Sequence, residues 1–151
     1  MERSNSRGNS GPFDVLLVES DPEAASRFVE SFEATDATET VSVVGDGADA
    51  LDFLHQRDGY ADAPRPDIIL LDLHVPGTSG NEILAELDSR PELRRIPVLV
   101  LTASDEAADV TRSYELNANA YLEKPTSSEA FVTMARAIED FWLGVAHLPP
   151  K

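Results

Sequence analysis

Short apolar runs alternate with segments of helical periodicity along most of this chain. Three of the runs, residues 15–18, 68–71 and 98–101, are apolar at every position. Strands buried on both faces of a parallel sheet have this unbroken pattern, because helices cover the side chains on either face. Two further runs, residues 41–44 and 120–122, complete a set of five predicted strands.

A segment of helical periodicity follows each predicted strand, and Asp21-Pro22 supplies a suitable N-cap and first position for the first helix. The alternation predicts a doubly wound α/β domain with right-handed crossovers. The strongest apolar stripe comes last and is typical of a core face, and its helix is expected to end near Leu143. The apolar positions of the five segments are Ala25, Phe28, Val29 and Phe32; Ala50, Leu51 and Leu54; Ile83, Leu84 and Leu87; Val110 and Tyr114; and Phe131, Met134, Ala135, Ile138, Phe141 and Trp142.

The length of 151 residues fits one domain. Residues 13–143 are predicted to form it, residues 1–12 a polar disordered tail, and residues 144–151 a C-terminal extension. Neither a signal peptide nor a membrane span is visible, so a cytoplasmic location is expected. The absence of cysteine excludes a disulfide scaffold, a cysteine nucleophile and a thiolate metal site.

The chain carries 28 acidic against 12 basic residues, for a formal net charge of −16. Nucleic acids and anionic lipids bind clustered Lys and Arg, so direct binding to either is not expected. Only Lys124 and Lys151 are lysines. An acidic, lysine-poor composition is typical of proteins from extreme halophiles, where concentrated salt screens like charges. An acidic mesophilic protein is the alternative.

Polar side chains stand where the predicted strands end, at the edge where open parallel sheets bind ligands. Glu19 and Asp21 follow the first strand, Thr102 the fourth and Lys124 the fifth, and Asp72 ends the third. Asp21 has the simpler role of an N-cap, and a lone lysine is usually a surface cation. A carboxylate within a buried run, however, needs a partner or a metal. Together these groups suit a divalent cation and a phosphoryl group.

The arrangement resembles the receiver domain of two-component response regulators over residues 13–143. The resemblance implies a five-stranded, flavodoxin-like parallel sheet of order 2-1-3-4-5 with helices on both faces. Segments 60–67 and 90–97 are similar to single-domain regulators that partner bacterial phytochromes. The motifs that carry the family resemblance are Leu16-Leu17-Val18-Glu19, Asp67-Ile68-Ile69-Leu70-Leu71-Asp72-Leu73 with Pro76 and Gly80, Val100-Leu101-Thr102-Ala103, and Tyr121-Leu122-Glu123-Lys124-Pro125.

The resemblance implies that Asp72 accepts a phosphoryl group from the phosphohistidine of a sensor histidine kinase, with Mg²⁺ or Mn²⁺ bound. Thr102 would then hydrogen-bond the phosphoryl group and Lys124 would pair with it. Tyr121 matches the aromatic switch position, and Glu19 belongs to the acidic pair that holds the metal. No separate substrate turnover is expected.

Two positions of the metal site need comment. The backbone carbonyl of His74 matches a metal ligand, so its imidazole is not required. Where the family carries a second acid, this chain has Ser20, and either Ser20 or the following Asp21 is left to complete the site. His55, His74 and His147 are read as ordinary surface or half-buried histidines, because their spacing contains no zinc motif.

A homodimer and an unidentified downstream protein are the further expected partners. A pseudo-receiver that binds proteins without phosphate is the main alternative, because of Ser20. An aspartate-nucleophile phosphatase would need a second Asp where His74 stands. A flavodoxin-like cofactor carrier would need a phosphate loop after the first strand, and Gly45-Asp46-Gly47 after the second is read as a turn.

Overall fold

The computed structural model describes residues 13–33, 38–73, 75–78, 80–102 and 120–146. Its strands are β1 (Phe13–Val18), β2 (Thr38–Val44), β3 (Ile68–Asp72), β4 (Val98–Thr102) and β5 (Ala120–Glu123). Its helices are α1 (Pro22–Glu33), α2 (Gly47–His55), α3 (Gly80–Ser89), α4 (Pro91–Arg94) and α6 (Ser128–Ala146). The strands form one parallel sheet in the order β2-β1-β3-β4-β5.

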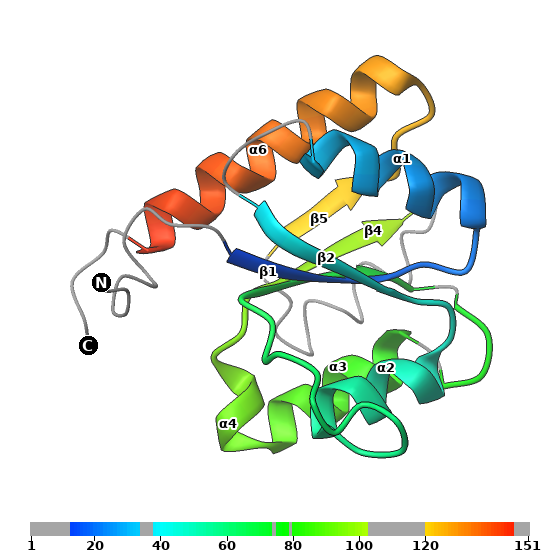
Figure 1. The fold of residues 1–151 in the computed structure, drawn as a ribbon, viewed down its shortest axis with the longest axis vertical. Helices are drawn as coiled ribbons and strands as arrows, with labels where there is room; N and C mark the ends of the chain where they lie inside the picture. Colours follow the sequence, from blue (N-terminus) through cyan, green and yellow to red (C-terminus); the bar gives the residue numbers. More distant parts are fainter. Residues whose placement is uncertain (1–12, 34–37, 74, 79, 103–119, 147–151) are drawn as a thin grey trace.

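Helices cover both faces of this sheet, with α1 and α6 on one face and α2, α3 and α4 on the other (Figure 1). Alternate residues of each central strand therefore enter two separate cores. Leu16, Val18, Ile69 and Leu71 pack with the helices α2 to α4. Val15, Leu17, Ile68 and Leu70 pack with α1 and α6. Because both faces are covered, β1 and β3 need apolar side chains at every buried position, which explains their unbroken runs.

The five predicted strands and the α/β parallel sheet are confirmed. The last predicted helix extends beyond its expected end near Leu143, because α6 runs to Ala146. Gly144 directly follows Leu143 but lies within α6 and does not end it, and helix ends are the least predictable part of a helix. Its expected core stripe is confirmed at Phe131, Ala135 and Ile138, which are buried. Phe131 meets Phe28 of α1 edge to face, with ring centroids 4.8 Å apart.

Three predicted segments lie outside the described residues. They are the fourth helix, marked by Val110 and Tyr114, the N-terminal tail, and residues 147–151 of the C-terminal extension. The short helix α4 was not predicted. Pro91 opens it, because proline is well suited to the first turn of a helix.

Candidate functional site at the carboxyl edge of the sheet

The strand order brings two acidic residues together at the centre of the sheet. β1 and β3 are neighbours, with Val18 opposite Leu71 in the parallel register. Glu19 directly follows Val18, and Asp72 directly follows Leu71, so the two carboxylates leave the sheet at the same level. The chain turns in opposite directions from β1 and β3, because β2 lies outside β1. Such a switch point is where open α/β sheets bind their ligands.

Lys124 joins these two carboxylates. It follows β5, and its Nζ donates to Glu19 Oε2 at 2.9 Å and to Asp72 Oδ2 at 3.1 Å. Glu19 is 2% exposed and Asp72 is 7% exposed, whereas the Lys124 side chain keeps 29% of its surface in solvent. The site is therefore a buried acidic pair with one ammonium group at its mouth. The expectation that Asp72 is a buried carboxylate with a partner is confirmed.

Burial and charge act against each other in this cluster. Burial raises the pKa of Glu19, and its hydrogen bonds with Lys124 and with the Asp21 N–H only partly offset that effect. Burial lowers the pKa of Lys124, but its hydrogen bonds with Glu19 and Asp72 outweigh burial and leave that pKa raised. Two carboxylates against one ammonium leave one negative charge in excess when all three are ionised. A cation would relieve this excess.

One carboxylate oxygen of the cluster is left without a partner. Glu19 Oε2 accepts from Lys124 and from the backbone N–H of Asp21, the latter at 3.0 Å. Glu19 Oε1 is buried and has no hydrogen-bond partner among the residues that the structure describes. Leaving a charged oxygen buried and unpartnered is unfavourable, and hard divalent cations take carboxylate oxygens as ligands. Glu19 and Asp72 therefore fit a divalent cation, although no group of three or more acidic or histidine ligands occurs among the described residues.

Ser20 and Asp21, which follow Glu19, differ in their contacts. Asp21 is exposed, and its Oδ1 accepts from the backbone N–H of Glu23 at 3.1 Å. Its carbonyl accepts the first helical hydrogen bond, from the N–H of Ala25. Asp21 is thus the N-cap of α1, which was its simpler interpretation. Ser20 is exposed and stands where the family resemblance implies a second acid.

The remaining predicted site residues are described only in part. Thr102 ends β4 and pairs with Glu123, and its neighbour Leu101 lies opposite Asp72. The backbone of Thr102 therefore reaches the same edge of the sheet. Tyr121 lies within β5, one strand farther out. The side chains of Thr102 and Tyr121, and the whole of His74 and His147, lie outside the described residues.

His55 has a structural role away from this edge. It is half-buried at the end of α2, with Nε2 2.9 Å from Glu86 Oε2 on α3. Its interpretation as an ordinary half-buried histidine is confirmed.

The sequence interpretation missed the start of α2. Gly45-Asp46-Gly47 was read as a turn, but Gly47 is the first residue of α2 and Asp46 is its N-cap. Asp46 Oδ1 accepts from the N–H of Asp49 at 2.8 Å. The signal was present, because Asp46 stands four residues before Ala50, the first residue of the helical stripe, and aspartate is a favoured N-cap. Two flanking glycines concealed it.

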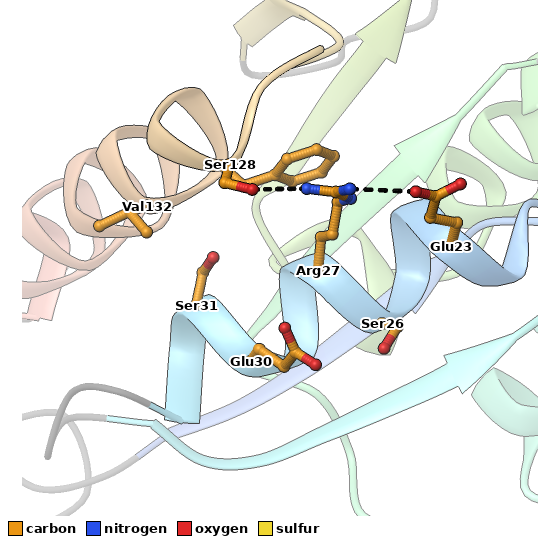
Figure 2. A pocket seen from close by; sticks show the side chains of 8 residues that line it. Glu23, Ser26, Arg27, Glu30, Ser31, Ser128 and Val132 are labelled. Carbon is orange, nitrogen blue, oxygen red and sulfur yellow. Dashed lines mark hydrogen bonds and ion pairs between the residues drawn. The ribbon is translucent and has the colours of Figure 1, made fainter.

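A cavity of about 430 Å³ lies between α1 and α6 (Figure 2). Arg27 crosses it and donates to Ser128 Oγ at 2.6 Å and to Glu23 Oε2 at 3.0 Å. None of its lining residues is a predicted site residue, and Arg27 joins the polar groups of Glu23 and Ser128. The cavity thus marks the contact of two helices, apart from the cluster at Asp72. The cavity is lined by Glu23, Ser26, Arg27, Glu30, Ser31, Ser128, Phe131 and Val132.

Comparison with known families and curated proteins gives one consistent result. Residues 15–136 match the response regulator receiver domain family. Response regulator Rcp1 of Synechocystis sp. is 42% identical over 141 residues, which span 93% of this chain and 96% of the relative. The probable methanogenesis regulatory protein FilR2 of Methanothrix harundinacea is 37% identical over 133 residues, spanning 88% of this chain and 85% of the relative.

Solved structures agree with this match. The Mn²⁺-bound form of response regulator Rcp1 has a TM-score of 0.82 at 40% identity, covering 92% of this chain and 100% of the other. The phosphorylated cyanobacterial phytochrome response regulator RcpA has a TM-score of 0.84 at 38% identity, covering 93% and 100%. The bacteriophytochrome response regulator AtBRR has a TM-score of 0.73 at 33% identity, covering 93% and 98%.

Proposed function

This chain belongs to the response regulator receiver family, and from that premise we propose that it accepts a phosphoryl group on Asp72 from a sensor histidine kinase. The observation that carries the proposal is the cluster of Glu19, Asp72 and Lys124, assembled from the ends of three strands. The likeness to regulators named for phytochromes favours a kinase of the phytochrome class. A cytoplasmic location is part of this proposal.

The reaction follows from the positions of these groups. A carboxylate oxygen of Asp72 attacks the phosphorus of the kinase phosphohistidine, the P–N bond breaks, and the imidazole leaves with the electron pair. Lys124, already 3.1 Å from Asp72 Oδ2, pairs with the incoming phosphoryl oxygens. Thr102, at the end of the neighbouring strand, donates a hydrogen bond from its hydroxyl to the same phosphoryl group. The chain thus promotes its own phosphorylation without turning over a separate substrate.

A divalent cation, Mg²⁺ or Mn²⁺, is part of the proposed site. When bound, it would neutralise charge on the phosphoryl oxygens. Glu19 and Asp72 would hold it through carboxylate oxygens, together with the backbone carbonyl of His74. Glu19 Oε1 supports this assignment, because it is a buried carboxylate oxygen that no described residue contacts through a hydrogen bond. Ser20 would contribute its hydroxyl or a bound water, since the carboxylate of Asp21 caps α1.

Phosphorylation of wild type and two variants by acetyl phosphate with Mg²⁺, followed by intact mass, tests the proposal. We expect wild type to gain one phosphoryl group and Asp72→Asn to gain none. Asp67→Asn is the matched control: Asp67 lies just before β3 at the opposite edge of the sheet, where its Oδ2 accepts from the Asp14 N–H. Equal labelling of wild type and Asp72→Asn would contradict the assignment of Asp72.

A second candidate is a pseudo-receiver that binds partners without phosphate. Ser20 favours it, because the site then has one acid fewer beside the cation. The same experiment separates the two functions, since a pseudo-receiver would show no labelling of wild type at any Mg²⁺ concentration.

We propose that the phosphorylated protein signals by forming a homodimer and by binding a downstream protein. Movement of Thr102 would draw Tyr121 inward and alter the surface around β5 and α6. Phe141 and Trp142, near the end of α6, would add apolar area for self-association. Sedimentation in high salt, with and without acetyl phosphate, checks this, and monomer alone in both conditions would contradict it.

None of the helices in the described ranges has the length and apolar character of a bilayer-spanning segment.

A further inference from the structure

Residues 75–78, which follow β3 and lead toward α3, are held against the start of α2. The backbone N–H of Gly47 donates to the carbonyl of Pro76 at 3.0 Å. Gly47 is the first residue of α2, and an N–H in the first turn of a helix has no partner within that helix. The segment 75–78 therefore satisfies a donor that α2 itself leaves open. Val75 adds to this anchorage, because its side chain is buried in the core beneath α2 and α3.

Gly47 is also a point of close backbone approach. A Cβ at this position would overlap the carbonyl oxygen of Thr78 and lie 2.6 Å from its carbonyl carbon. Both atoms belong to the backbone, so a side-chain rotation cannot relieve the overlap. Gly45, two residues earlier, differs in this respect, because a Cβ there would meet no atom within 4 Å. Position 47 therefore requires glycine for contact with Thr78.

The segment is connected back to the residue after Asp72. The N–H of Gly80 donates to the carbonyl of Leu73 at 3.2 Å. A Cβ on Gly80 would lie 2.6 Å from the Cα of Leu73, so this second contact also joins backbone to backbone. Thr78 lies two residues before Gly80, and Leu73 directly follows Asp72. A displacement of Thr78 would therefore be transmitted to the chain that leaves Asp72.

Asp46 makes the start of α2 a firm support. Its side chain caps the helix through the N–H of Asp49, and its carbonyl accepts from the N–H of Ala50 at 3.1 Å. The cap fixes the direction in which the Gly47 N–H points. Without it, the first turn would fray and the hydrogen bond to Pro76 would weaken.

We propose that Gly47, supported by its cap Asp46, is a positioning residue for the chemistry at Asp72. It holds residues 75–78 in place, and through Gly80 and Leu73 it fixes the backbone from which the Asp72 carboxylate projects. Mg²⁺ demands near-octahedral geometry, so a small displacement of one ligand weakens its binding. The inference rests on the proposed function, because it gives Gly47 a role only if Asp72 binds the cation.

The test measures Mg²⁺ affinity by calorimetry without a phosphodonor, and separately the acetyl phosphate labelling rate across a Mg²⁺ titration. For Gly47→Ala we expect Mg²⁺ affinity to fall about tenfold, the lower end of what loss of an outer-shell support costs a metal site. The half-saturating Mg²⁺ concentration for labelling should rise equally, with the maximal rate at saturating Mg²⁺ preserved. Asp46→Ala should show a smaller change in the same direction.

Two controls separate positioning from general loss of stability. Gly45→Ala places a methyl group in open space and should leave Mg²⁺ affinity unchanged. Asp67→Ala removes a carboxylate that accepts a backbone hydrogen bond at the opposite edge of the sheet, so it should lower the melting temperature without changing Mg²⁺ affinity.

Two results would overturn the inference: Gly45→Ala weakening Mg²⁺ binding as much as Gly47→Ala, or Asp46→Ala melting earlier while binding Mg²⁺ like wild type. If Gly47→Ala does not fold, the Mg²⁺ affinities of Asp46→Ala and Asp67→Ala are compared instead. The inference then requires a lower affinity in Asp46→Ala and an unchanged affinity in Asp67→Ala. Failure of the proposed function looks different. Wild type would then bind Mg²⁺ and remain unlabelled, or would bind no Mg²⁺ at all, and the second result would remove the inference as well.

Discussion

The ammonium group of Lys124 lies 2.9 Å from Glu19 Oε2, although the two residues are 105 positions apart in the chain. The same group lies 3.1 Å from Asp72 Oδ2, so two buried carboxylates share one cation. A metal ion that uses these carboxylates must therefore share them with Lys124. This competition has measurable consequences.

Lys124→Ala is expected to destabilise the metal-free protein by about 3 kcal/mol. This is the lower end of the range for removing one partner of a buried ion pair, because Lys124 is partly exposed. Mg²⁺ affinity should rise, since the competing ammonium is gone. Urea melts with and without Mg²⁺, together with calorimetry, measure both changes.

Arg27→Ala serves as the control, because Arg27 of α1 makes two polar contacts away from the site, with Glu23 of α1 and Ser128 of α6. Lys124→Arg should keep the fold but blunt the response to phosphorylation, because a planar guanidinium cannot replace a compact ammonium between two carboxylates. A lower Mg²⁺ affinity in Lys124→Ala would contradict the competition.

Ser20→Asp is expected to tighten Mg²⁺ binding and to speed labelling by acetyl phosphate. The new carboxylate would restore the acid that this chain lacks beside Glu19. Asp21→Ala should leave Mg²⁺ affinity unchanged and cost about 1 kcal/mol of stability, because its carboxylate caps α1. Calorimetry and urea melts at matched salt test the pair of variants. Mg²⁺ affinity that falls in Asp21→Ala would instead assign Asp21 to the metal.

Glu86 predicts a pH dependence of stability that is separate from the site. Partial burial raises the pKa of Glu86, but hydrogen bonds from His55 and Arg90 outweigh that effect and hold the pKa below its usual value. Because the folded-state pKa is lowered, ionised Glu86 stabilises the protein above its unfolded-state pKa of about 4.5. That stabilisation is lost as the pH falls through the lowered pKa.

Glu86→Gln should therefore be less stable than wild type at pH 7, by about 0.5 kcal/mol for a partly exposed pair, and the difference should shrink as the pH falls through the lowered pKa of Glu86. Urea melts from pH 7 to pH 3 measure the difference. Glu82→Gln, on the exposed side of α3, is the control and should show a smaller pH-dependent difference. A constant gap between wild type and Glu86→Gln at every pH would exclude ionisation as its cause.

The net charge of −16 predicts stabilisation by salt. At about 1 M salt the Debye length is near 3 Å, so repulsion among surface carboxylates is largely screened. We expect the urea midpoint to rise from low to multimolar KCl. Sucrose, which is excluded from protein surfaces without screening charge, provides the control. Equal midpoints at low and high KCl would contradict the halophile interpretation.

The fold was predictable because burial on two faces leaves a clear pattern. The strands β1, β3 and β4 each contain an unbroken apolar run, and helices of period 3.6 cover the sheet. Asp72 was predictable for the opposite reason, since a carboxylate inside such a run needs a partner. The start of α2 was not predicted. A glycine between an aspartate cap and a helix is typical of a turn until the backbone of Thr78 is seen against it.

The sequence by itself determined the five strands, the faces that the predicted elements bury, and that acidic and basic groups end the strands. Only the tertiary structure decided which of those groups form hydrogen bonds with one another. Periodicity records burial of each residue against its surroundings, but a hydrogen bond depends on the relative position of two distant segments. Thus the cap role of Asp21 became visible only with its contact to the Glu23 N–H. Likewise, the unpartnered Glu19 Oε1 and the contact of Gly47 with Thr78 exist only once the strands and loops have packed.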